Sequence, residues 1–159
     1  MRNALLLQLR AVPGEPAAAD EGASKGASLQ AVDRMIAGCL QQAATERLPP
    51  LSIVVVDASG AIVAAKRQEG APPASLDAAL LKARTAIRTS APTAALAPLV
   101  AQDRPTRDAF LVLGMTAIPG GIPLAGSDSR IVGAVGVSGA QPNQDASCAQ
   151  RAVDTAGNK

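Results

Sequence analysis

The fold is decided by a stretch of small and β-branched residues, Arg130-Ile-Val-Gly-Ala-Val-Gly-Val137. Its length and composition predict a strand, which follows the polar turn Gly126-Ser-Asp-Ser129. Glycine inside a strand lowers its stability, so Gly133 and Gly136 indicate that a ligand, a helix or another chain approaches the backbone closely. Packing of a helix is the explanation that we favour.

The residues before this stretch predict the rest of the sheet. The run Leu51-Ser-Ile-Val-Val-Val-Asp57 is rich in β-branched residues, and Ala61-Ile-Val-Ala-Ala-Lys66 can return beside it after the tight turn Ala58-Ser-Gly60. Residues 110–115 are expected to form another strand. Pro119-Gly-Gly-Ile-Pro123 predicts a rigid turn with a short edge strand, so the sequence predicts five strands in all.

Helices are predicted where apolar residues recur every three or four positions. The first follows Ser28 as its N-cap and ends before Pro49-Pro50, and the second follows Ser75 and runs to Ile87. A shorter helical piece is expected around residues 93–101, and Asn143 is expected to cap a last helix over residues 144–156. These elements predict an α/β (α+β) fold, in which helices flank a mainly antiparallel five-stranded sheet. We expect residues 1–27 to form a mobile N-terminal arm and residues 28–159 a single domain.

The chain of 159 residues contains no histidine, and this restricts its chemistry. Ser-His-Asp and Cys-His triads, His-ligated zinc and haem on a proximal histidine are excluded, and we expect no metal site. Lys and Arg number 15 against 13 Asp and Glu, which gives a net charge of +2, and the aromatic residues amount to one Phe. A basic stripe and a base-stacking platform are both missing, so we expect no nucleic-acid partner.

The two cysteines, Cys39 and Cys148, lie far apart and form no CxxC motif. A disulfide between them is one alternative, and buried thiols in a reducing compartment are the one that we favour. The apolar run at the start of the sequence is interrupted by Gln8 and Arg10, and no stretch approaches the length of a membrane span. We therefore expect a soluble cytoplasmic protein without a membrane partner.

The charges on the predicted second helix fall on two sides. At ~100° per residue, Asp77, Arg84 and Arg88 share one stripe, whereas Lys82 lies apart from them among small side chains. That small-residue surface could be a pocket wall or a subunit contact, but an ordinary exposed lysine is the interpretation that we favour.

Two aspartates are further candidates. Asp57 could pair across strands with Arg67, but we favour a simpler role for it, in opening the turn that follows. Asp145 lies in the first turn of the last helix, where its charge interacts favourably with the helix dipole.

Five motifs follow one another in fixed order between about Leu29 and Val153. They are Val54-Val-Val-Asp57 with Gly60; Lys66-Arg67 with Gly70-Ala71-Pro72 and Ser75; Lys82-Ala-Arg-Thr85-Ala86; Pro119-Gly-Gly-Ile-Pro123; and Val132-Gly-Ala-Val-Gly-Val-Ser-Gly139 with Asp145 and Cys148-Ala149. In this order they resemble the GlcG/HbpS family, which includes haem-binding HbpS proteins and the C-terminal domain of PduO.

The resemblance implies a profilin-like layering, assembly of the chain with itself into dimers or oligomers up to octamers, and a small-molecule ligand. Haem or another tetrapyrrole is the candidate cofactor, although none is required. Arg67, Lys82 and Thr85 could bind a carboxylate or propionate, and Gly120 and Gly121 could offer backbone amides. The iron ligand would have to be Met115, Cys39, Cys148, Lys82 or a threonine in place of histidine.

Two function classes therefore remain open, and we favour binding over catalysis. The first is an oligomeric binding protein for a small molecule, with haem or another tetrapyrrole as the candidate. The second is a cofactor-independent enzyme of the isomerase or lyase type, acting on a small carboxylated or carbonyl-containing metabolite. In that enzyme Lys82 would act as base or cation and Asp57 or Asp145 as proton carrier. A protein that only scaffolds assembly is a third alternative.

Overall fold

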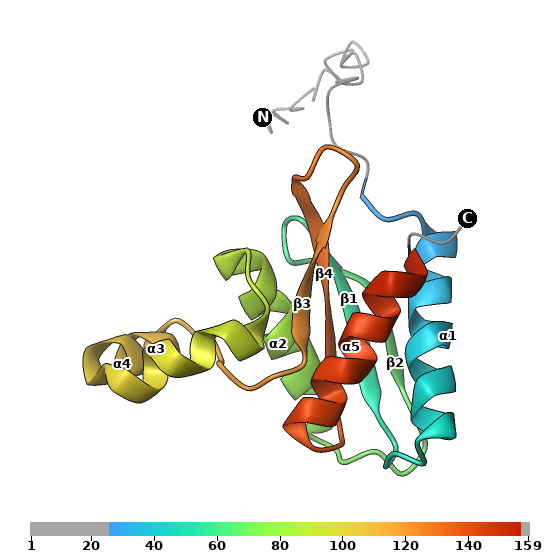
Figure 1. The fold of residues 1–159 in the computed structure, drawn as a ribbon, viewed down its shortest axis with the longest axis horizontal. Coiled ribbons are helices and arrows are strands. Elements are labelled where there is room, and N and C mark those ends of the chain that lie inside the picture. Colours follow the sequence, from blue (N-terminus) through green and yellow to red (C-terminus); the bar gives the residue numbers. More distant parts are fainter. Residues whose placement is uncertain (1–25, 157–159) are drawn as a thin grey trace, which may run out of the picture.

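The computed structural model describes residues 26–156, so all but the last two residues of the expected N-terminal arm lie outside the described part. One antiparallel sheet of four strands forms the centre of the fold (Figure 1). Its spatial order is β2-β1-β4-β3, which makes β3 an edge strand as expected. The strands are β1 (Ser52–Asp57), β2 (Ile62–Arg67), β3 (Gly121–Ala125) and β4 (Ile131–Ser138).

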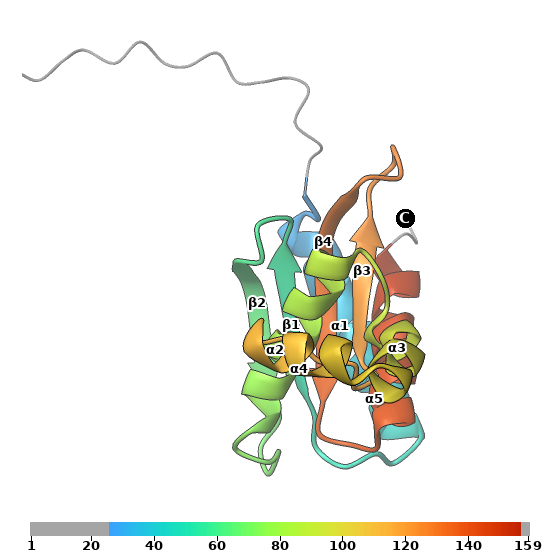
Figure 2. The same cartoon turned by 90° about the vertical axis from the view of Figure 1, so that its left-hand side faces the viewer.

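Helices cover both faces of this sheet. Helices α1 (Leu29–Thr45) and α5 (Pro142–Ala156) lie side by side on one face, and α2 (Ser75–Thr89) lies on the other (Figures 1 and 2). After α2, a short 3₁₀ helix η1 (Thr93–Leu96) leads into α3 (Ala97–Gln102) and α4 (Arg104–Val112). Helices α3 and α4 project away from the sheet, and we call these two helices the arm (Figure 1).

Strand β1 explains why both faces must be covered. Its apolar side chains alternate, so that Ile53 and Val55 join the core under α1 and α5, whereas Val54 and Val56 join a second core under α2. All four are at most 1% exposed. A continuous β-branched run with no polar alternation is typical of a strand that is buried on both faces.

Gly136 on β4 allows α2 to lie directly against the sheet. A Cβ atom at this position would lie 1.9 Å from the carbonyl oxygen of Ala79, which is closer than atoms can approach. The expected close approach of a helix is therefore confirmed at Gly136. At Gly133 the neighbour is instead the carbonyl oxygen of Val56 on the adjacent strand, at 2.5 Å from such a Cβ.

The expectation of buried thiols is wrong, because Cys39 on α1 and Cys148 on α5 form a disulfide. Both cysteines are fully buried, and α1 and α5 pack along each other, so the two sulfur atoms meet inside one helix–helix contact. The sequence separation of 109 residues gave no sign of this pairing. Cys39 and Cys148 therefore give no support to the expected reducing compartment.

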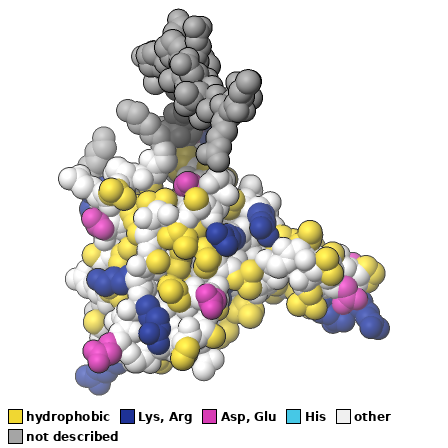
Figure 3. All heavy atoms as spheres, turned by 180° about the vertical axis from the view of Figure 1, so that it is seen from behind, with side chains coloured by type: hydrophobic (Ala, Val, Ile, Leu, Met, Phe, Trp, Pro, Cys, Tyr) yellow, Lys and Arg dark blue, Asp and Glu magenta, His cyan; other side chains and the backbone are white. Residues whose placement is uncertain are grey.

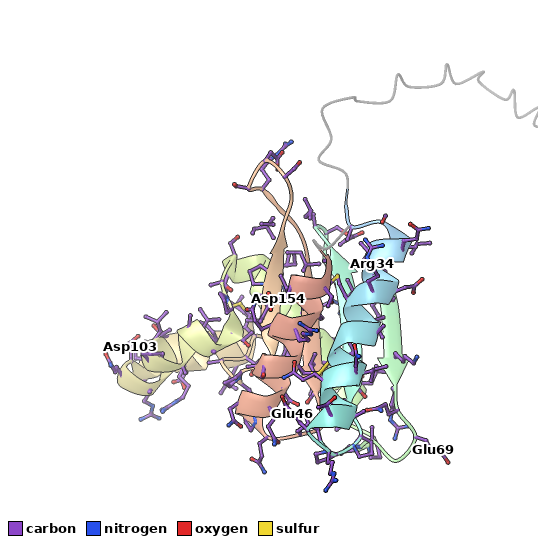
Figure 4. The ribbon with its side chains drawn as sticks, turned by 45° about the vertical axis from the view of Figure 1, so that its right-hand side comes forward. Arg34, Glu46, Glu69, Asp103 and Asp154 are labelled. Carbon is purple, nitrogen blue, oxygen red and sulfur yellow. A yellow bond between two sulfur atoms is a disulfide. The ribbon has the colours of Figure 1, made fainter. Side chains whose placement is uncertain are left out.

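The predicted strand over residues 110–115 is also wrong, and this is why the sheet has four strands and not five. The first half of the segment, residues 110–112, belongs to α4, which Asp103 caps by accepting a hydrogen bond from the Thr106 amide at 2.9 Å. Pro105 in the first turn favours a helix start. The apolar run Phe110-Leu-Val-Leu113 fits either structure by composition, and these capping signals decide for the helix. Asp103 lies at the far end of the arm (Figure 4).

Two predicted helix caps differ from the structure, whereas the cap at Ser28 is confirmed by its bond from the Ala31 amide. Ser75 is the first residue of α2 and follows the N-cap residue Ala74, and its buried hydroxyl donates to the Pro72 carbonyl. Asn143 lies inside the first turn of α5, since that helix begins at Pro142.

Within residues 26–156, no helix is both long and apolar enough to cross a membrane.

Candidate functional site

Lys82 and Asp145 form a buried ion pair, in which Lys82 Nζ lies 2.8 Å from Asp145 Oδ2. Lys82 comes from the middle of α2 and Asp145 from the first turn of α5, so the pair connects the two helix layers beside the end of β4. Both side chains are 3% exposed. The expectation that Lys82 is an ordinary exposed lysine is therefore wrong; its stem and ammonium group are both inside the protein.

Backbone groups satisfy the remaining bonds of this pair. Lys82 Nζ donates a second hydrogen bond to the carbonyl oxygen of Val137 at 2.9 Å, and Asp145 Oδ1 accepts from the amide of Ala140 at 3.0 Å. Among the described residues, no buried side-chain nitrogen or oxygen is left without a partner. The two charges are thus held by each other and by fixed backbone dipoles.

Gly120 packs directly against the buried pair and covers Lys82 Nζ. It has a φ of 125°, and a Cβ there would lie 2.6 Å from the Val137 oxygen and 3.0 Å from Lys82 Nζ. Only glycine fits both the backbone conformation and the space. A Cβ at the neighbouring Gly121 would lie 2.3 Å from the Lys82 carbonyl oxygen, and the Gly121 amide donates to Thr93 Oγ1 at 3.0 Å.

Burial dominates the electrostatics of Asp145 and raises the pKa of its carboxyl group. The Lys82 ammonium and the Ala140 and Gly139 amides act in the opposite direction and favour the carboxylate. An acid of this kind can serve as a proton carrier only where a substrate reaches it. Here the surrounding backbone and Gly120 fill the space around both charges, so the pair is closed to ligands in this conformation.

The structure brings only part of the predicted site together. Lys82, Asp145, Gly120 and Gly121 meet as described. Thr85 is buried on α2, where its hydroxyl donates to the Leu81 carbonyl at 2.8 Å and accepts from the Thr116 amide at 3.1 Å.

Met115 precedes Thr116 and is half-buried, so it lies near α2 without joining the buried pair.

Asp57 and Arg67 lie elsewhere, at opposite ends of the β1–β2 hairpin. The carboxylate of Asp57 accepts from the amides of Ser59 and Ala61 at 2.8 and 3.0 Å, so the expected role in opening the turn is confirmed. The Ser59 hydroxyl donates to the same oxygen at 2.6 Å, and this bond, followed by the one from the Ala61 amide, lowers the pKa of Asp57. Arg67 is exposed and donates to the Ala71 carbonyl. Neither residue contributes to the site around Lys82.

Two adjoining hollows lie on the outer side of α2, and we call them together the arginine groove. One, of about 340 Å³, lies between the β1–β2 turn and α2. The other, of about 320 Å³, lies between α2 and residues 113–114, which directly follow α4. Arg84 and Arg88 line both hollows. Figure 3 shows the molecule from behind, where Lys and Arg side chains lie among hydrophobic ones near the base of the arm.

The sequence placed Arg84 and Arg88 on one charged stripe but gave no reason to call that stripe a site. The missing information was which chain segments border it. The hairpin brings the turn Ser59-Gly-Ala61 to this side of α2, and the arm brings Leu113 there. No spacing in the sequence predicts either contact.

Comparison with solved structures gives matches over most of the chain. A double mutant of HbpS from Streptomyces reticuli is 28% identical with a TM-score of 0.80, over 93% of this chain and 99% of that one. Klebsiella pneumoniae protein ORFY is 28% identical with a TM-score of 0.74, over 83% and 91% of the two chains. The fold also resembles PduOC, solved as a complex with haem, with a TM-score of 0.75, 24% identity and coverage of 82% and 95%.

A search of curated proteins finds no match. The family described as "Haem degrading protein HbpS-like" matches residues 28–154, which is most of the sequence. The fold, with α1 and α5 on one face of the sheet and α2 on the other, is similar to that of HbpS and so agrees with the family match. The chain therefore belongs to the HbpS-like family.

Proposed function

We propose that this chain is a small-molecule-binding protein whose ligand is haem or another tetrapyrrole. Membership of the HbpS-like family supports the ligand class. HbpS itself matches at 28 and 29% identity in two structures, and PduOC, whose fold is similar, was solved with haem bound. The proposal assigns binding, and no catalytic step, to the chain.

The observation that carries binding over catalysis is the closed state of the buried pair. Catalysis by Lys82 as base requires a neutral amine that a substrate can reach. Lys82 instead donates to Asp145 and Val137, and Gly120 covers it. Asp57, the other proposed proton carrier, is held by the amides of its own turn on another part of the surface. The pair therefore supports the fold, by joining α2 to α5.

The candidate iron ligands named by position differ in whether they are already engaged. Cys39 and Cys148 are joined in the disulfide, and Lys82 is bound to Asp145. Thr85 uses its hydroxyl within the fold. Met115 is the numbered candidate that is left: the residue is half-buried, its neighbour Thr116 bonds to Thr85 on α2, and a thioether is a known axial ligand of haem iron. Bound haem would supply an iron centre on a flat apolar ring with two propionates, and Met115 would hold that iron.

A titration with haemin tests this function. The full chain is expected to give a saturable shift of the Soret band at stoichiometric haemin. Met115→Leu keeps the apolar volume but removes the sulfur, so it should change the position of the band, whereas Met35→Leu, in the core under α1, should not. Lack of a saturable shift with the unmodified chain would overturn the haem proposal.

We also propose that the chain assembles with copies of itself through the arm. Helices α3 and α4 have six and nine residues, and neither contains a buried residue. Helices this short are marginal in water unless a packed face supports them. The exposed fractions of the Leu111 and Val112 side chains are 72 and 87%, so the arm presents an apolar surface that a second copy can cover.

Light scattering after size exclusion tests assembly. The chain should elute at a multiple of 15.9 kDa, and Leu111→Ser with Val112→Ser should shift it toward 15.9 kDa. Leu29→Ser is a matched control, because Leu29 is also exposed, at 68%, but lies on α1. A monomeric unmodified chain would contradict this proposal.

A further inference from the structure

The arginine groove has the features of a binding site for an anion with an apolar body. Its two cations, Arg84 and Arg88, lie one helical turn apart on the exposed side of α2. Leu80, Ile87 and the partly exposed Leu81 contribute apolar surface along the helix, beside polar atoms of the β1–β2 turn and of the arginines. Leu113, 58% exposed, closes the end nearest the arm.

Each arginine is positioned but retains unused donors. Arg84 Nε donates to the Gly60 carbonyl at 3.1 Å, and Arg88 Nη1 donates to the Leu113 carbonyl at 2.9 Å. A guanidinium has five N–H donors, so most of them remain available on both side chains. The two backbone contacts fix the arginines between the hairpin turn on one side and the arm on the other.

No carboxylate within residues 26–156 forms an ion pair with either arginine at 4.0 Å or less. Asp77 borders the groove but lies about two helical turns from Arg84, and Asp57, near the turn, is occupied by the Ser59 and Ala61 amides. Two like charges spaced four residues apart on a helix repel each other. An anion that bridges them would remove this repulsion and gain charge-assisted hydrogen bonds.

We propose that Arg84 and Arg88 form the carboxylate-recognition site for an amphiphilic dicarboxylate, whose apolar part lies against Leu80, Leu81 and Ile87. This inference rests on the proposed function, because the two propionates and flat apolar ring of a tetrapyrrole have this chemistry. It replaces Arg67, which the sequence had suggested for carboxylate binding and which lies at the far end of the hairpin. The ring would then lie close to Met115, two residues after Leu113.

The proposal is tested by removing the arginines from the protein or the free carboxylates from the ligand. The probes are haemin and haemin dimethyl ester, which has the same ring and iron but no free carboxylates. Arg84→Gln and Arg88→Gln should each weaken haemin binding roughly tenfold, and the double variant by more, in line with the loss of charge-assisted bonds. The ester should bind all of these proteins with similar affinity.

Arg34→Gln is the matched control. It removes the same charge from an exposed arginine on α1, which covers the opposite face of the sheet (Figure 4). Its haemin affinity should equal that of the unmodified chain. Arg84→Lys with Arg88→Lys should bind between the unmodified chain and the double glutamine variant, because lysine keeps the charge but not the bidentate fork.

The outcomes separate the two proposals. If haemin binds the unmodified chain and the double variant equally well, the arginine site is overturned and tetrapyrrole binding stands. If haemin binds neither, tetrapyrrole binding is overturned, and dodecanedioate measured by calorimetry decides the arginine site. Binding of that dicarboxylate to the unmodified chain alone supports the site, and binding to neither protein overturns it.

Discussion

Helix α2 carries Lys82 and Arg84 two residues apart, and the two cations have opposite surroundings. Lys82 points into the protein and is 3% exposed, with its charge balanced by Asp145. Arg84 and Arg88 point outward, and within residues 26–156 their hydrogen bonds are to backbone carbonyls. A step of two residues turns ~200° around a helix, so adjacent cations on one segment can serve structure and recognition separately. We therefore expect changes at Lys82 to alter stability and changes at the arginines to alter binding.

Lys82→Met gives the largest expected loss of stability. It leaves the Asp145 carboxylate buried without its cation, which costs about 3–5 kcal/mol of unfolding free energy for a broken buried pair. Urea unfolding followed by circular dichroism measures the loss. Lys82→Met combined with Asp145→Asn should recover part of it, because the uncompensated charge is then gone. A Lys82→Met protein as stable as the unmodified chain would show that the pair contributes nothing to the fold.

The deficit of Lys82→Met should also depend on pH. Lys82 lowers the pKa of Asp145, so its removal raises that pKa further above the unfolded value of 3.8. A group with a raised folded pKa contributes stability in full below its unfolded pKa and loses that contribution as pH rises through the folded pKa. The deficit should therefore be smallest in acid and grow toward neutral pH. A deficit that is equal at every pH would contradict this account of Asp145.

Removal of the disulfide tests whether the two regions are independent. Cys39→Ala with Cys148→Ala removes the covalent link between the packed helices α1 and α5 and should lower the unfolding free energy by about 2–4 kcal/mol, since the closed loop is long. No residue of the arginine groove touches this bridge, so haemin affinity should be unchanged. A large loss of affinity in this folded variant would show that the groove depends on the α1–α5 layer.

Gly120→Ala probes the closure of the buried pair with a single methyl group. The new Cβ would lie 2.6 Å from the Val137 oxygen, at a φ of 125° that disfavours alanine. We expect a loss of about 1–3 kcal/mol in thermal or urea unfolding, from strain and from displaced backbone. Gly114→Ala is the comparison, because it also has a positive φ, of 59°, but no atom within 4 Å of its Cβ position. Equal losses at both sites would mean that backbone conformation, and not closure, determines the effect.

The smallest stability change is expected at the arginines. Arg84→Gln and Arg88→Gln remove exposed side chains without ion-pair partners in the described residues, so the unfolding free energy should change by no more than about 0.5 kcal/mol. The expected loss of haemin affinity would therefore not come from unfolding. A destabilisation as large as that of Lys82→Met would erase the contrast between the two sides of α2.

Much of the fold could be predicted from local pattern. The β1–β2 hairpin, the strand at residues 130–137, the cap at Ser28 and the close packing on Gly136 each depend on residues within one short segment. Residues 110–115 could not be assigned in the same way, because an apolar run of that length fits a strand or a helix. Asp103 and Pro105, which start α4, lie several residues before the apolar run and decide the outcome.

The site was predicted less well, because its contacts join distant segments. The structure brings Lys82, Asp145 and Gly120 of the predicted site together, but what they can do depends on their burial, which the sequence did not show. The spacing that places Lys82 apart from the charged stripe was correct, and the interpretation as an exposed side chain was not.

Residue type and short-range periodicity are enough to establish the family motifs, the absence of histidine chemistry and the helix stripe that holds Arg84 and Arg88. The contact of Lys82 with Asp145, 63 residues away, and that of Cys39 with Cys148 depend on the folded chain. So does the groove that the arginines border, which is built from a hairpin turn and the arm. These contacts follow from how helices pack on the two faces of the sheet, and packing brings together residues whose sequence separation carries no information about their distance.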